Sequence, residues 1–140
     1  MGDLFIGARH LHAPLISVMP VLHGFLVLDD EQGYRTTFGG DQAQGLPFGS
    51  PLVLYEERYT AGHGDAHGVV VLRLAWPNIT AEIVRTSFRT TQSRIGALNL
   101  IYNPLTRNCN MVVSTLVLQA GLALPPPPAR FVPGYGQSIL

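Results

Sequence analysis

The segment from Met111 to Ala120 would be apolar on both sides if it is helical, and this constrains the fold more than any other stretch of the chain. Four of its residues are β-branched, which is also compatible with a buried strand. We predict a helix that belongs inside the protein. The residues that recur at helical spacing are Val112, Val113, Leu116, Val117 and Ala120, and Met111 and Leu118 make the opposite side apolar.

The only cysteine of the chain, Cys109, falls at the start of this predicted helix. Asn108 or Asn110 can cap the free N–H groups there, and Gly121 can supply a left-handed C-cap. A thiol in a first helical turn faces the positive end of the helix dipole, which lowers its pKa and favours the thiolate. The alternative is that Cys109 is a small buried hydrophobic residue, as most free cysteines are.

The size and charge of the chain exclude several classes of protein. It has 140 residues, and its nine acidic residues balance nine basic ones, all of which are Arg. A balanced chain lacks the basic surface of a nucleic-acid-binding protein, and a chain without Lys excludes mechanisms that need a Lys base or Schiff base. One cysteine allows neither an internal disulfide nor a Cys-rich zinc site. We expect one domain over residues 1–124, a Pro-rich tail over 125–140, no metal and no cofactor.

The beginning of the chain, MGDLFIGARH, has no basic segment followed by an apolar run, and no stretch approaches about 18 consecutive apolar residues. We therefore expect no secretory signal and no integral membrane segment, and a cytoplasmic location in the producing cell.

The remaining elements are predicted from hydrophobic periodicity and turn residues. The strand at 21–28 and the strand at 34–38 flank a turn-forming segment and are predicted to form a hairpin. The strand at 69–74 is continuously apolar until Arg73, which favours a central position in the sheet. The predicted elements are a short strand near Leu4 to Ile6, strands at Val21 to Leu28, Tyr34 to Phe38, Leu52 to Tyr55 and Val69 to Leu74, and a helix from Pro77 to about Arg94 with Ile79, Ile83, Val84 and Phe88 buried.

Three segments are predicted as loops or tail. The Gly-rich stretch at 39–51 is predicted to lie over the sheet or at the entrance of a site. The segment from Glu56 to Gly68 contains His63, Asp65 and His67 within AGHGDAHG, and its glycines favour a solvated loop over a metal site. The tail either docks apolar residues such as Tyr135 on the domain or stays loose.

A cysteine at a helix start and a histidine on a strand are the two parts of a thiol nucleophile system, because the imidazole accepts the thiol proton and returns it to the leaving group. His23 lies on the strongest predicted strand and shares a face with Phe25 and Val27. It therefore points into the core or into a cleft lined by core residues. A lone histidine on such a strand is more often a packed core residue.

The order of these parts resembles the circularly permuted papain-like cysteine hydrolases, in which the histidine precedes the cysteine. The closest local likeness is to the PPPDE or desumoylating isopeptidases, and the permuted NlpC-type amidases and lecithin:retinol acyltransferase-like enzymes share the order. The resemblance covers about residues 20 to 122. It rests on Asn108-Cys109-Asn110, on Asn99, Tyr102 and Asn103 before them, and on His23 in LHGFLVLDD followed by TTFGG at 36–40.

This resemblance implies an α+β fold in which an antiparallel sheet of about four or five strands packs against two main helices. It implies Cys109 as nucleophile and His23 as base, with the Cys109 N–H in an oxyanion hole and Asn108 and Asn110 shaping the site. The residue that would orient His23 is left open. The candidates are Thr37, Arg35 and Asp41.

The leading functional hypothesis is a cysteine hydrolase that cleaves an amide or peptide bond through a thioacyl intermediate. The Arg-only basicity suggests a bacterial protein, and the resemblance then implies a peptidoglycan amidase or an effector toxin, exported without a signal peptide and held by an immunity protein. A protein isopeptidase and a lipid acyltransferase are the alternatives with the same chemistry. A non-catalytic binding module with an inert buried cysteine is the alternative from another class.

Overall fold

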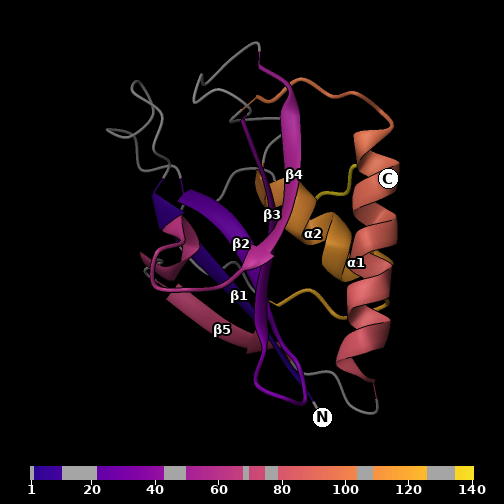
Figure 1. Cartoon of the computed structure of the whole chain (residues 1–140). Coiled ribbons are helices and arrows are strands. Elements are labelled where there is room, and N and C mark those ends of the chain that lie inside the picture. The colour runs from indigo at the N-terminus through magenta and orange to yellow at the C-terminus, as the bar shows by residue number, and fades with distance from the viewer. Residues whose placement is uncertain are drawn as a thin grey trace.

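The computed structural model describes residues 2–10, 22–42, 50–67, 70–74, 79–103, 109–125 and 135–140. These residues form an α+β fold in which two α-helices cover one face of a five-stranded antiparallel sheet (Figure 1). The elements are β1 (Asp3–His10), β2 (Leu22–Asp29), β3 (Arg35–Gln42), β4 (Leu52–Arg58), the short 3-10 helix η1 (Gly64–His67), β5 (Val70–Leu74), α1 (Ala81–Gly96) and α2 (Cys109–Gln119).

The strand order is β4-β3-β2-β1-β5, which corrects two of the sequence predictions. The first strand is not confined to residues 4–6, because β1 is eight residues long and pairs with both β2 and β5. The apolar strand β5 lies at an edge of the sheet and not at its centre. A continuous apolar run is typical of a strand whose two faces are covered. It does not indicate how many other strands pair with that strand.

The predicted hairpin of β2 and β3 is confirmed, and its turn is held by Asp30. The Asp30 carboxylate accepts the N–H groups of Gln32 and Tyr34, at 2.8 and 2.9 Å. Gly33 has φ of 81°, a left-handed conformation that glycine adopts without strain. The strand β3 runs on to Gln42, so Gly39 and Gly40 belong to the sheet and not to the predicted Gly-rich loop.

Helix α1 begins after Thr80, whose side-chain oxygen accepts the Ile83 N–H. Glu31, from the β2–β3 turn, accepts the Ala81 N–H at 3.1 Å and so fastens the helix start to the hairpin. The predicted burial of Val84 and Phe88 is confirmed. The predicted burial of Ile83 is wrong, since its side chain is 56% exposed.

Helix α2 is the central element that the sequence predicts. Every residue from Cys109 to Val117 is buried. The helix ends in a Schellman motif, because Leu122 N–H bonds Val117 O, Gly121 N–H bonds Leu118 O, and Gly121 has φ of 76°. The β-branched residues of this segment are therefore helical, and burial has outweighed their preference for strands. The core around α2 consists of Leu4, Ile6, Leu26, Leu28, Phe38, Leu74, Ala81, Val84, Phe88, Val112, Val113, Leu116 and Val117.

The end of the tail, residues 135–140, docks on α2. Gly136 N–H donates to Ser114 Oγ at 2.7 Å, and Ile139 N–H donates to Thr115 Oγ1 at 2.9 Å. Tyr135 and Ile139 pack against the core. Both hydroxyl groups also donate to carbonyls one turn earlier in α2, so the tail adds a second hydrogen bond to each of them.

Among the described residues, neither helix has the length and apolar character needed to cross a bilayer.

Candidate active site

The first turn of α2 lies against the sheet at the point where β2 and β3 cease to pair. Ladder pairing of these strands ends at Leu26↔Phe38, although both strands continue beyond it. Past that point Gly24 N–H donates to the side-chain oxygen of Asn110 at 2.7 Å. The Asn110 amide thus replaces a neighbouring strand as the partner of the Gly24 backbone.

Two glycines make this close approach possible. A Cβ atom at Gly24 would lie 2.7 Å from Asn110 Oδ1, and one at Gly40 would lie 2.8 Å from Val112 Cγ2. Both distances are too short for real contacts. Because neither glycine carries a side chain, α2 can lie directly against the sheet backbone.

The thiol of Cys109 is buried beside Tyr102. Cys109 is 1% exposed, and its Sγ lies 4.0 Å from Tyr102 Oη. Tyr102 is brought there by backbone pairing with the segment before β4, since Tyr102 N–H bonds Ser50 O at 2.8 Å. Within the described part of the chain, no hydrogen bond joins the thiol to His23.

The expected lowering of the Cys109 pKa is wrong. Burial raises the pKa of the thiol, and the charge of Asp41 raises it further. The Gly24 N–H, the Tyr102 side chain and Arg9 act in the opposite direction, yet the pKa remains about 12. Desolvation by the surrounding core therefore outweighs the contacts that favour the thiolate, so the resting group is a thiol.

We predict slow labelling of this thiol in the folded protein. A pKa of about 12 leaves a thiolate fraction about a thousandfold below that of an ordinary cysteine of pKa about 8.5, and burial slows access further. Iodoacetamide at pH 8 should label the native protein at least about a thousandfold more slowly than the urea-unfolded protein. Equal rates would contradict the buried, protonated thiol.

A second group of polar side chains lies on the sheet face opposite the helices. Gly24 faces α2, so its neighbour His23 points to the other side of β2. The centre of the group is Asp65, which comes from η1 and is 0% exposed. Its carboxylate contacts one side chain from each of four adjacent strands: Arg9 of β1, His23 of β2, Thr37 of β3 and Tyr55 of β4.

The distances in this group define a compact hydrogen-bonded cluster, which we call the Asp65 cluster: Arg9, His23, Thr37, Tyr55 and Asp65. Arg9 Nε lies 2.7 Å from Asp65 Oδ1, Thr37 Oγ1 lies 2.6 Å from Oδ2, and Tyr55 Oη lies 2.7 Å from Oδ2. His23 Nε2 lies 3.0 Å from Tyr55 Oη and 3.8 Å from Asp65 Oδ1. His23 is therefore held at Nε2.

The protonation states of the cluster follow from its contacts. Burial acts to raise the pKa of Asp65, but the charge that His23 carries when protonated and the hydrogen bonds from Thr37, Arg9 and Tyr55 outweigh it, and the pKa lies below its usual value. Burial and the Asp65 charge raise the pKa of Tyr55 well above its usual value. Asp65 is thus a carboxylate and Tyr55 a neutral phenol at neutral pH.

A histidine outside the cluster supports η1. Asp65 N–H donates to His63 Nδ1 at 3.1 Å, and His63 Nε2 lies 3.5 Å from a carboxylate oxygen of Glu57. The Asp65 backbone is therefore anchored by a side chain that is itself paired at the surface.

The structure divides the residues that the sequence predicted for the site. His23 and Thr37 belong to the Asp65 cluster. Asp41 lies at its edge, 33% exposed, with Oδ2 3.4 Å from Arg9 Nη2. Arg35 pairs with Asp29 at the surface and does not join the cluster. Asn110 lies against the Gly24 backbone, and Asn108 lies outside the described residues.

The cysteine starts the helix that packs on one face of the sheet, whereas the histidine points to the other face, and their side chains have different partners. The charges of Asp41 and Arg9 shift the pKa of Cys109, so the thiol lies within electrostatic range of the Asp65 cluster. The residues that sequence reasoning missed are Asp65, Tyr55 and Arg9. The glycines around Asp65 favour a loop, and no local pattern links Asp65 to Arg9, 56 positions earlier.

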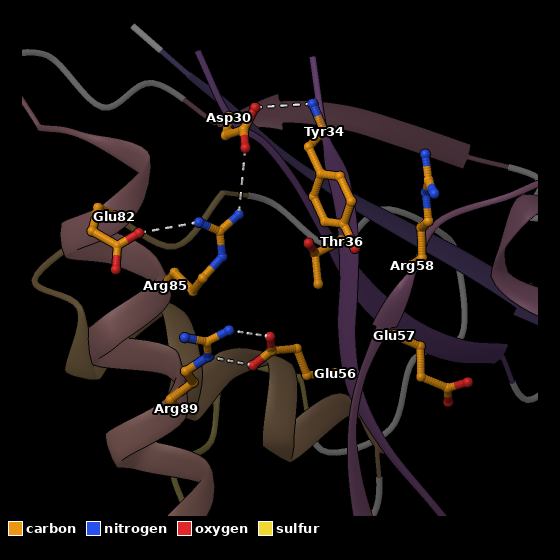
Figure 2. Close-up of a pocket in the computed structure, with 9 residues that line it drawn as sticks. All are labelled: Asp30, Tyr34, Thr36, Glu56, Glu57, Arg58, Glu82, Arg85 and Arg89. Atoms are coloured by element: carbon orange, nitrogen blue, oxygen red, sulfur yellow. Dashed lines mark hydrogen bonds and ion pairs between the residues drawn. The ribbon is translucent and has the colours of Figure 1, made fainter. Parts of the chain in front are cut away.

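The groove of about 370 Å³ between α1 and the β3–β4 strands is a different feature (Figure 2). Its two α1 arginines are already paired. Arg89 forms two 2.7 Å bonds with the Glu56 carboxylate, and Arg85 pairs with Glu82 and Asp30. Ion pairs in this groove join α1 to the sheet. Neither Cys109 nor His23 lines the groove.

Among the described residues, no group of three or more histidine, cysteine or acidic side chains is arranged to hold a metal ion. Comparison of the chain with protein-family models, with curated proteins and with solved structures finds no match.

Proposed function

We propose that the protein is a cysteine hydrolase of permuted papain-like fold, which cleaves an amide bond with Cys109 as nucleophile and His23 as base. One observation carries the proposal. The Asn110–Gly24 hydrogen bond joins the residue after Cys109 to the residue after His23, at the opening between β2 and β3. The two segments that bear the reactive groups are thus fastened to each other, although they lie 86 positions apart.

The reaction would run as general-base catalysis because the resting thiol is protonated. Cys109 would transfer its proton to His23 as sulfur attacks the carbonyl carbon, and His23 would then protonate the departing amine. The thioacyl intermediate would be hydrolysed by water activated by the same imidazole. The backbone N–H of Cys109, at the start of α2, would stabilise the oxyanion. Since His23 points away from α2 at rest, a rearrangement at the opening between β2 and β3 must bring the imidazole to the thiol when substrate binds.

The substrate would be a peptide, a peptidoglycan stem peptide or a protein conjugate. The Arg-only basicity, which suggests a bacterial protein, favours an amide of peptidoglycan first, and the local likeness to desumoylating isopeptidases supports an isopeptide bond to a ubiquitin-like protein second. Purified protein incubated with each of these substrates separates the two, since only the true substrate gives new amine termini that mass spectrometry detects. Transfer of an acyl group to lipid would instead leave an acylated product.

We predict that Cys109→Ala abolishes hydrolysis, with a loss of about a thousandfold or more in kcat/KM, because Cys109 is the only cysteine of the chain. The fold should remain, since deleting one buried sulfur costs about 1–2 kcal/mol. The matched control is Leu118→Ala on the exposed side of the same helix, which should keep its activity. Intact-mass measurement should find the acyl adduct on wild type and not on Cys109→Ala.

A non-catalytic binding domain is the second candidate, and the burial of Cys109 with its pKa of about 12 favours it. In that case the thiol is only a core residue and the Asp65 cluster is structural. Full activity in Cys109→Ala, or no acyl adduct with any of the substrates above, would reject the hydrolase in favour of this domain.

A further inference from the structure

The hydrogen bonds of the Asp65 cluster can be oriented by counting protons. The Asp65 carboxylate is ionised beside Arg9 and can only accept hydrogen bonds. Oδ1 takes the Arg9 Nε–H, and Oδ2 takes the hydroxyl groups of Thr37 and Tyr55. Every hydrogen bond at this carboxylate therefore points toward Asp65.

Tyr55 has a single hydroxyl proton, and Asp65 uses it. If this proton pointed to His23 instead, the phenol oxygen would face the ionised carboxylate at 2.7 Å with no hydrogen between them. The contact between Tyr55 Oη and His23 Nε2, at 3.0 Å, must then have the imidazole as donor. His23 is consequently protonated on Nε2.

We infer that Tyr55 relays the charge of Asp65 to His23 and fixes the neutral imidazole as the Nε2–H tautomer, so that Nδ1 is the nitrogen that accepts a proton. The tautomer stands on the hydrogen bonds alone. Its role in catalysis rests on the proposed function. Tyr55 and Asp65 are then positioning residues, since neither would touch the substrate.

The relay gives each proton a defined place in the proposed reaction. The Cys109 S–H bond breaks, its proton moves to His23 Nδ1, and sulfur bonds to the carbonyl carbon. The resulting imidazolium keeps its Nε2–H on Tyr55, which is stabilised by Asp65. The C–N bond then breaks as Nδ1 returns the proton to the amine.

Nitrogen-15 NMR of the wild-type protein tests this inference directly, because the ring-nitrogen shifts of a neutral histidine distinguish its two tautomers. We expect the His23 ring, at a pH where it is neutral, to be protonated on Nε2. Protonation on Nδ1 would overturn the inference. This measurement needs neither substrate nor a variant.

Asp65→Asn should reverse the chain of hydrogen bonds. Arg9 requires an acceptor at the Oδ1 position, so the new NH2 group takes the place of Oδ2 and donates to Tyr55 Oη. The Tyr55 hydroxyl proton then turns to His23 Nε2, and the ring becomes the Nδ1–H tautomer. The matched control is Asp41→Asn, the same substitution at the other carboxylate beside Arg9, which should leave the tautomer unchanged.

The kinetic consequence separates this inference from the proposed function. With Nδ1 already protonated, Asp65→Asn should lower kcat by about a hundredfold or more with KM unchanged. An Nε2–H tautomer in folded Asp65→Asn would overturn the relay even if Cys109 proves catalytic. Full activity in Cys109→Ala would overturn the hydrolase and leave the relay to be decided by the two NMR results.

Discussion

Asp65→Ala is expected to destabilise the protein by about 3–5 kcal/mol, the largest loss of stability that we predict for one substitution. The change removes the 2.7 Å ion pair of Arg9, a residue that is only 8% exposed. It also leaves the hydroxyl groups of Thr37 and Tyr55 without their acceptor. Urea unfolding followed by circular dichroism measures the difference.

Asp41→Ala is the matched control for this prediction. Asp41 also pairs with Arg9, but at 3.4 Å and with 33% of its side chain exposed, so that water screens the pair. Its loss should cost about 1 kcal/mol or less. If Asp65→Ala cost no more than Asp41→Ala, the buried carboxylate would not stabilise the four strands as we describe.

The same variant should change the response of the protein to acid. The pKa of Asp65 is lowered in the folded state, so its contribution to stability is complete above its unfolded pKa of about 3.9. That contribution is lost as the pH falls through the lower, folded value. Wild type should therefore lose more stability than Asp65→Ala below about pH 4. If the free energy of unfolding of both proteins fell in parallel with pH, the Asp65 carboxylate would not be the cause of the acid sensitivity.

Gly24→Ala is expected to cost about 2–4 kcal/mol, because a methyl group would lie 2.7 Å from Asn110 Oδ1. The Asn110 side chain would have to move and give up its hydrogen bond with the Gly24 N–H. Gly62→Ala is the control. The nearest atom to its Cβ is 4.0 Å away, and it should change stability by no more than about 0.5 kcal/mol.

A double-mutant cycle identifies the contact responsible for this loss. Asn110→Ala alone removes the acceptor of the Gly24 N–H, and it also removes the atom that the new methyl group would meet. The double variant should therefore be more stable than the sum of the two single losses implies. Simple additivity would show that the methyl group clashes elsewhere.

The sequence was most informative where structure depends on local pattern. The apolar residues of α2 predicted its burial, Gly121 predicted the end of that helix, and the turn residues before Tyr34 predicted the hairpin. In each case the signal lies within a few residues of the structure it determines.

The sequence was least informative where structure depends on distant partners. β1 contains Gly7 and Arg9, which interrupt its apolar pattern, and only pairing with β2 and β5 reveals its length. The largest influence on the pKa of Cys109 is burial in the core assembled around it, which the sequence near Cys109 does not reveal. Asp65 is important because side chains from four strands meet at its carboxylate. The residues next to Asp65 in the sequence do not indicate these partners.

The position of Asp65 in the chain has a consequence for folding. Each of the four strands whose side chains it contacts precedes it, so the carboxylate can exchange its water for protein partners only after these strands have paired. Its contacts should therefore form after the transition state of folding. Removing them should leave the folding rate nearly unchanged and speed unfolding. The carboxylate would then set how long the native state persists and have little influence on how quickly it is reached.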